Sequence, residues 1–71
     1  MQNAIYETTI ANALNACDEA RIYDHDSEDL WAQAVRHLNN AQQWASEFNF
    51  SLADDEIRRA VAALRCIPSE G

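Results

Sequence analysis

Apolar residues recur at steps of three and four along most of the chain, the spacing that gathers side chains on one face of an α-helix. Between residues 3 and 22 the apolar stripe consists of Tyr6, Ile10, Ala13, Leu14, Cys17 and Ala20. Between residues 27 and 48 it consists of Leu30, Ala34, Leu38, Ala41, Ala45 and Phe48. Between residues 52 and 66 it consists of Ala53, Ile57, Ala60, Val61 and Leu64. The pattern predicts three amphipathic helices, at about 3–22, 27–48 and 52–66.

The breaks between these stripes are short. At the second break we expect Asn49 to take the left-handed conformation that closes a helix, and Ser51 to cap the next helix. Pro68 is expected to end the third helix. Short connections favour antiparallel neighbours, and 13 alanines favour helix over strand. We therefore predict an all-α fold, a small three-helix up-down-up bundle that forms a single domain of residues 1–71.

Large apolar residues are few for three helices. A chain of this size buries only about 60% of the surface that it exposes when unfolded, so its stability is marginal. Ile5, Tyr6 and Tyr23 also give the first helix a second apolar shoulder. We expect a homodimer, and the alternative is a small monomer packed mainly through alanines.

The charge of the chain is strongly negative. There are 12 acidic residues against 5 arginines and no lysine, which gives a formal net charge of −7. Such a chain repels phosphates, so direct nucleic-acid binding is disfavoured and a partner protein with a basic surface is favoured. No apolar run is long enough for a membrane span, and the N-terminal residues do not resemble a signal peptide. We expect a cytoplasmic protein that does not bind membranes.

Negative charge is concentrated around the first break. Twelve residues hold six carboxylates and only Arg21 to offset them. These carboxylates are Asp18, Glu19, Asp24, Asp26, Glu28 and Asp29. Part of the cluster has a structural explanation, because Asp26 or Ser27 can cap the second helix and acidic residues are favoured in a first turn. Ser51 followed by Asp54, Asp55 and Glu56 indicates the same device at the third helix. The remaining charge is either a solvated surface or a docking surface for a basic partner.

The residues of this region do not match a catalytic or metal site. The stretch from Tyr23 to Trp31 lacks the central glycine of a calcium loop. A zinc site or disulfide that uses Cys17, His25 and Cys66 is disfavoured, because helical phase places Cys17 inward and Cys66 toward solvent. A Cys17 nucleophile would be buried and would lack an orienting third group. We predict no metal, no cofactor and no enzymatic activity.

The segment Glu47–Glu56 is similar to the end of the second helix and the following loop of acyl and peptidyl carrier proteins. That resemblance implies a phosphopantetheine serine, and Ser27 after Asp26 is the candidate. The family's Gly-x-Asp-Ser-Leu motif falls two helical turns closer to this loop, where the present sequence has Ala34. A carrier-like or small-ligand-binding domain is therefore kept as an alternative.

Two aromatic residues are candidate anchors for a partner, Tyr6 and Trp44, of which Trp44 lies at the edge of the apolar stripe beside His37. In size, acidity and lack of motifs the chain resembles the inhibitors that phages and mobile elements direct against host proteins. Some of those inhibitors imitate nucleic acid with carboxylates. We therefore predict a protein-binding inhibitor that uses Asp18, Glu19, Asp24, Asp26, Glu28, Asp29, Trp44 and Tyr6. The alternative of structural class is a helical adaptor or subunit of a larger assembly.

Overall fold

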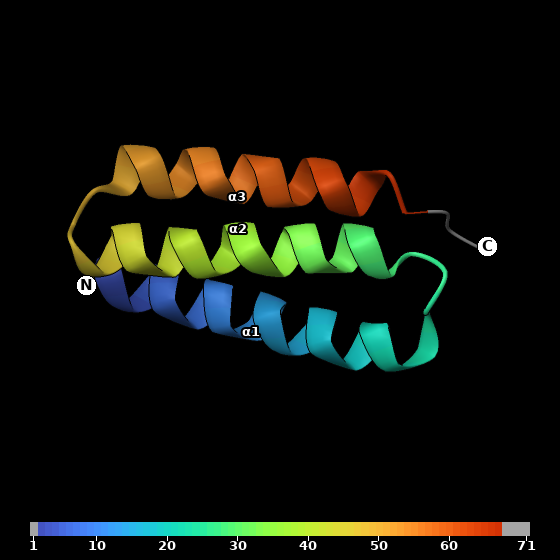
Figure 1. Cartoon of the computed structure of the whole chain (residues 1–71). Coiled ribbons are helices and arrows are strands. Elements are labelled where there is room, and N and C mark those ends of the chain that lie inside the picture. Colours follow the sequence, from blue (N-terminus) through green and yellow to red (C-terminus); the bar gives the residue numbers. More distant parts are fainter. Residues whose placement is uncertain (1, 68–71) are drawn as a thin grey trace.

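The computed structural model describes the backbone of residues 2–67 and the side chains of residues 5–67. This part of the chain forms three helices and no strand: α1 (Gln2–Tyr23), α2 (Glu28–Ser46) and α3 (Phe50–Arg65). Figure 1 shows them side by side, with each helix antiparallel to the next. The all-helical prediction is confirmed, and every predicted helix end lies within two residues of the observed one.

α2 is the central helix of the bundle. It packs against both α1 and α3, whereas α1 and α3 make no close backbone contact with each other within residues 2–67. The buried residues of α2 are Ala34, Leu38, Ala41 and Ala45. Because the side chains along a helix contact set the distance between the axes, three alanines on α2 let both neighbours approach closely. α3 contributes further small residues to its packing face, namely Ala53, Ala60 and Ala63.

The core has little volume. Ile10 is the largest fully buried side chain, and Leu38 and Cys17 are also buried. Full burial of one isoleucine stabilises a fold by about 1.5–3 kcal/mol, so Ile10 carries much of the packing energy of α1. Most larger apolar side chains around this core are half-buried: Tyr6, Leu14, Trp31, Val35, Ile57 and Leu64.

Two residues of the predicted inward stripes are exposed, Val61 at 39% and Phe48 at 70%. Val61 is uncovered because α1 does not pack closely on α3. Phe48 is displaced because α2 ends at Ser46, before the phenylalanine can continue the stripe.

The end of α2 differs from the prediction in its closing residue. The left-handed residue is Phe48, with φ of 60°, and not Asn49. The backbone N–H of Asn49 donates to the carbonyl of Trp44 at 2.8 Å, and that of Phe48 donates to Ala45 at 3.0 Å. This pair of bonds is the Schellman motif, in which glycine usually holds the left-handed position.

The start of α3 also corrects the prediction. Asn49 is the N-cap, and its side-chain oxygen accepts from the backbone N–H of Leu52 at 3.4 Å, so Ser51 lies inside the helix. The first turn of α3 contains no acidic residue. Asp54, Asp55 and Glu56 therefore do not complement the dipole of the first turn.

At α2 the N-cap is Ser27, one of the two predicted residues, and Glu28 and Asp29 lie in the first turn as expected. The Ser27 side chain makes no capping hydrogen bond, although its carbonyl accepts from Trp31 N–H at 3.0 Å. At the other end of the chain, α3 finishes at Arg65 with Cys66 as its C-cap, and Pro68 lies outside the described residues.

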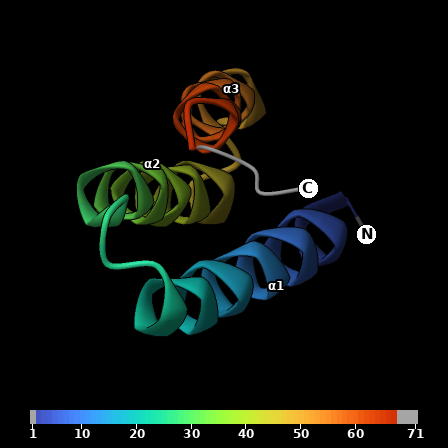
Figure 2. The ribbon, with the colours of Figure 1, turned by 90° about the vertical axis from the view of Figure 1, so that its right-hand side faces the viewer.

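α1 and α3 are joined by side chains at one end of the bundle. The Tyr6 hydroxyl donates to an Asp54 carboxylate oxygen at 2.7 Å, and the Tyr6 ring lies 5.0 Å from that of Phe50. From this contact the two helices diverge toward the end that holds the α1–α2 loop, as Figures 1 and 2 show. The bundle is therefore wedge-shaped, closed at Tyr6 and open at the loop.

Candidate functional site

Six carboxylates from the last turns of α1, the following loop and the first turn of α2 lie at the open end of the bundle. We name them the acidic end: Asp18, Glu19, Asp24, Asp26, Glu28 and Asp29. Five are exposed and Asp24 is half-buried. Arg21 pairs with Glu28 at 3.4 Å, a partly exposed contact that contributes about 0–1 kcal/mol. The acidic end therefore keeps most of its negative charge.

Asp24 has a structural role within this cluster. One of its carboxylate oxygens accepts a hydrogen bond from the Trp31 indole N–H at 3.1 Å, and its backbone N–H donates to Ala20 at 2.9 Å. These two bonds fix the loop against both α1 and α2. A substitution of Asp24 would disturb the loop as well as the charge, so the other exposed carboxylates are better probes of binding.

An apolar groove of about 640 Å³ lies beside the acidic end. Figure 2 shows that α1 and α3 diverge toward this end of the bundle. It is open to solvent, and its walls come from all three helices and the residues after α3. The lining residues are Ala13, Ala16, Cys17, Ala20, Trp31, Leu64 and Ile67. This groove was not predicted from the sequence, although the alanines along the first helix were a signal that its apolar stripe is too small to fill the space opposite.

Cys17 is the one lining residue with nucleophilic chemistry. Its thiol is 3% exposed, and burial raises its pKa, with a smaller contribution from the negative charge of Asp18. A thiol with a raised pKa stays protonated at neutral pH and is a poor nucleophile. Cys17 is buried, Cys66 is exposed and both are free, as the helical phase predicted.

The remaining candidate groups do not assemble into a site. Within the described residues no group of three or more His, Cys, Asp or Glu side chains is placed to hold a metal ion. Ser27 is only 8% exposed, which leaves its hydroxyl little access for the attachment that a carrier protein requires.

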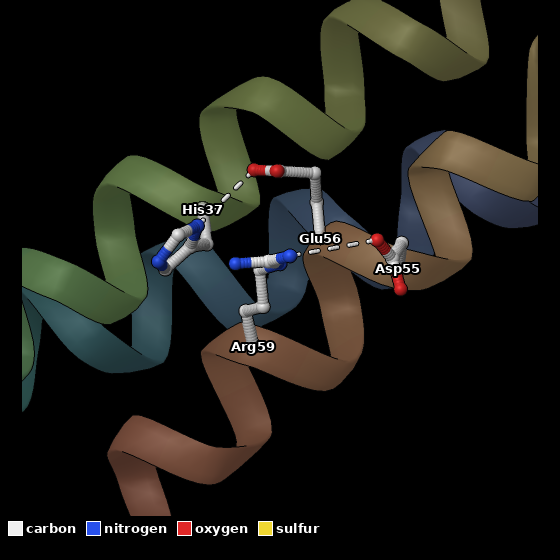
Figure 3. A network of polar contacts seen from close by, with 4 residues as sticks. All are labelled: His37, Asp55, Glu56 and Arg59. Carbon is white, nitrogen blue, oxygen red and sulfur yellow. Dashed lines mark hydrogen bonds and ion pairs between the residues drawn. The ribbon is translucent and has the colours of Figure 1, made fainter.

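A second acidic cluster, made of Asp54, Asp55 and Glu56, makes contacts between helices and within α3. Glu56 on α3 pairs with the Nδ1 atom of His37 on α2 at 3.1 Å, and both side chains are about one-fifth exposed. The pKa of Glu56 is lowered, mainly by this hydrogen bond. Burial acts in the opposite direction, and a hydrogen bond from Asn40 lowers the pKa further. Arg59 pairs with Asp55 at 3.8 Å within α3, and Figure 3 shows the four side chains. With Asp54 bound to Tyr6, all three carboxylates have a structural partner.

Tyr6 and Trp44, the predicted aromatic anchors, lie away from the acidic end. Tyr6 is half-buried against Phe50 and its hydrogen bond to Asp54 raises the pKa of its phenol. Trp44 is half-buried near the end of α2. The structure thus separates the predicted partner-binding residues into an acidic group and an aromatic group at opposite ends of the bundle.

The same end of the bundle carries further exposed apolar residues besides these two anchors, among them Phe48, which was predicted to lie in the core. Phe48 is 70% exposed and its ring lies 6.4 Å from that of Phe50, edge to face. Ile5 and Leu52 are also exposed, at 67% and 39%. We name these residues together with the two anchors the aromatic end: Ile5, Tyr6, Trp44, Phe48, Phe50 and Leu52.

Comparison of the chain with protein-family models, with curated proteins and with solved structures gives no match. Of the helices in the described part of the chain, none is long and apolar enough to cross a membrane. The function must therefore be argued from the acidic end, the groove and the aromatic end.

Proposed function

We propose that this protein is a small non-enzymatic inhibitor that binds a basic surface of another protein through its acidic end. The observation that carries the proposal is the gathering of six carboxylates at one end, of which one is paired with an arginine. A surface of one sign steers a partner of the opposite sign and orients it. Where that partner surface normally holds nucleic acid, the carboxylates take the place of phosphates and block it.

Two exposed carboxylates of the acidic end provide a clean test, because they have no structural contact among the described side chains. The double variant Asp18→Lys, Glu19→Lys reverses the charge at two exposed positions of α1. The matched control Glu7→Lys, Glu47→Lys changes the same number of exposed charges elsewhere.

Each form would be immobilised and used to capture proteins from the native host, with identification by mass spectrometry. We expect a partner that the wild type and the control retain and the acidic-end variant loses. Its affinity should fall roughly tenfold or more between about 0.05 M and about 0.3 M salt, because exposed charges are screened over this range. A partner that both variants retain, or a complex insensitive to salt, would contradict the proposal.

A second candidate function, a helical subunit of a larger assembly, is favoured by the aromatic end. Phe48 is held exposed in a conformation that is costly for a bulky residue, and such strain is concentrated at functional positions. Phe48→Gly removes the ring and suits the left-handed backbone, so loss of a captured partner would report on contact and not on unfolding. Under this function the acidic-end variant keeps its partner and Phe48→Gly loses it.

A further inference from the structure

We infer that the apolar groove receives an amphipathic α-helix of the basic partner, with the partner's cations against the acidic end. This inference rests on the proposed function, since it names the element of the partner that the acidic end attracts. It is carried by the shape of the groove and by the charges beside its walls.

The length of the groove along α1 suits a short stretch of helix. Its α1 wall runs from Ala13 to Ala20, which is about 10 Å or two helical turns. The α1 and α3 walls belong to helices that run in the same direction, so a fourth helix between them would complete a bundle with α2 opposite. Two turns accommodate three apolar anchors at positions i, i+3 or i+4, and i+7 of a bound helix.

The walls differ in size and suit different parts of a helix. Ala13, Ala16 and Ala20 allow close approach of a backbone on the α1 side. Trp31 and Leu64 are half-buried and offer apolar surface to inserted side chains. The Trp31 ring is already oriented by its hydrogen bond to Asp24, so fixing this side chain on binding costs little conformational entropy.

Charge determines which helix fits. Asp24 contacts Trp31 of the groove wall, whereas Asp18 and Glu19 stand next to Cys17 and Ala20 in sequence and lie about 100° around α1 from them, at the sides of the groove wall. Two cations also adjoin the lining, Arg21, which pairs with Glu28, and Arg65 on the α3 side. Three carboxylates and these two arginines neighbour the groove lining, and the other three carboxylates of the acidic end lie at the same end of the bundle. The surrounding charge therefore favours a helix whose apolar stripe is flanked by lysine or arginine.

Other occupants fit less well. A second copy of the chain would bring another net charge of −7 against the same acidic end, which opposes association. A small apolar ligand would remain partly in water, because the groove is open along one side, whereas ligand pockets enclose most of a ligand's surface.

The test uses the full chain and three synthetic peptides of about 18 residues, long enough to form a helix on binding. The first carries leucines at i, i+3 or i+4 and i+7 with flanking arginines. The second has the same composition in an order that destroys the stripe, and the third keeps the stripe and replaces each arginine with glutamate. Calorimetry gives the affinities, and NMR shifts of Ala13, Ala16 and the Trp31 indole locate the site.

A matched pair of alanine variants tests the groove itself. Ala16 and Ala62 are both exposed on helices, but only Ala16 lines the groove. We expect the first peptide alone to bind one-to-one with shifts at the groove. Ala16→Trp should weaken it at least about tenfold, and Ala62→Trp should change it by less than about twofold.

The outcomes separate this inference from the proposed function. If the scrambled cationic peptide binds as tightly and Ala16→Trp has no effect, the groove inference fails and the acidic end stays a binding surface. If the acidic striped peptide binds as tightly as the cationic one, charge selects nothing and the proposed function fails too. A dimer of the chain alone that Ala16→Trp dissociates would assign the groove to a second copy and overturn the inference.

Discussion

Phe48 joins two features that rarely occur together in one residue. Its backbone takes the left-handed conformation, with φ of 60°, and its ring is 70% exposed. For residues other than glycine this conformation costs about 1–2 kcal/mol, because Cβ crowds the neighbouring carbonyl. The Schellman hydrogen bonds of Phe48 and Asn49 hold the strained residue in place.

Comparing two substitutions of Phe48 isolates the strain. Phe48→Gly and Phe48→Ala both remove the ring and its contact with Phe50, but only alanine keeps a Cβ atom. We expect the glycine variant to be more stable than the alanine variant by about 1 kcal/mol, or roughly 4–8 °C in melting temperature. Thermal unfolding followed by circular dichroism measures the difference. Equal stability of the two variants would mean that position 48 is not left-handed in solution.

The placement of single residues shows where sequence reasoning succeeds and where it stops. Cys17 and Cys66 were placed correctly because both follow the regular phase of a helix. Phe48 was placed wrongly because its position depends on where the helix ends. Helix ends are uncertain by one or two residues, and each residue turns the side chain by about 100°. The prediction of Ser51 as the N-cap of α3 was wrong for the same reason, because the helix begins earlier and Asn49 is its N-cap.

At the scale of elements, α2 and α3 are joined by the polar contact between His37 and Glu56 as well as by alanine packing. The pKa of Glu56 is lowered in the folded chain, so its ionised form contributes stability. That contribution is fully present above the unfolded carboxyl pKa of about 4.3 and is lost as pH falls through the lower folded value.

Glu56→Gln should therefore reduce the free energy of unfolding at pH 7 and have a progressively smaller effect below about pH 4.3. Urea unfolding at a series of pH values gives the difference between variant and wild type. Asp55→Asn is the control, because its contact with Arg59 is exposed and lies within one helix, where such pairs contribute about 0.3–0.5 kcal/mol. A Glu56→Gln effect that is constant from pH 7 to pH 3 would rule out this linkage.

The arrangement of the helices could be predicted only in part. The all-helical class and the positions of the helices follow from apolar spacing within single segments. The acidic end could be found because its residues are close together in the sequence. The groove could not be predicted, because it depends on the angle at which α1 diverges from α3. The apolar spacing within one helix carries no information about that angle.

For the molecule as a whole, the balance of charge and packing decides stability. The chain has a net charge of −7 and a small core, so its free energy of unfolding is small. Electrostatic self-repulsion is therefore a large effect relative to that free energy. We expect this repulsion to be greatest at the acidic end, where six carboxylates fall within twelve residues with Arg21 as the one arginine among them.

Added salt should raise the melting temperature of the wild type, because it screens this repulsion. Asp18→Lys, Glu19→Lys should stabilise the chain by about 0.5–1 kcal/mol at low salt, through relief of repulsion between like charges. Glu7→Lys, Glu47→Lys makes the same change in net charge, so a smaller gain there shows that the local crowding matters. Glu47 is the C-cap of α2, where a lysine also gains from the helix dipole, so equal gains from the two pairs would contradict a special contribution of the acidic end. Thermal unfolding at low and high salt checks both statements.

The α1 wall of the groove contains one core residue, Cys17, and three alanines that are not buried, Ala13, Ala16 and Ala20. Ile10 and Cys17 are buried, whereas Ala16 is exposed and Ala13 and Ala20 are half-buried. A change at Ala16 therefore alters the groove wall without opening a cavity in the core. In evolutionary terms, exposed positions such as Ala16 can diversify by single substitutions while Ile10 and Cys17 stay under selection for stability, so related chains can acquire different partners without losing the fold.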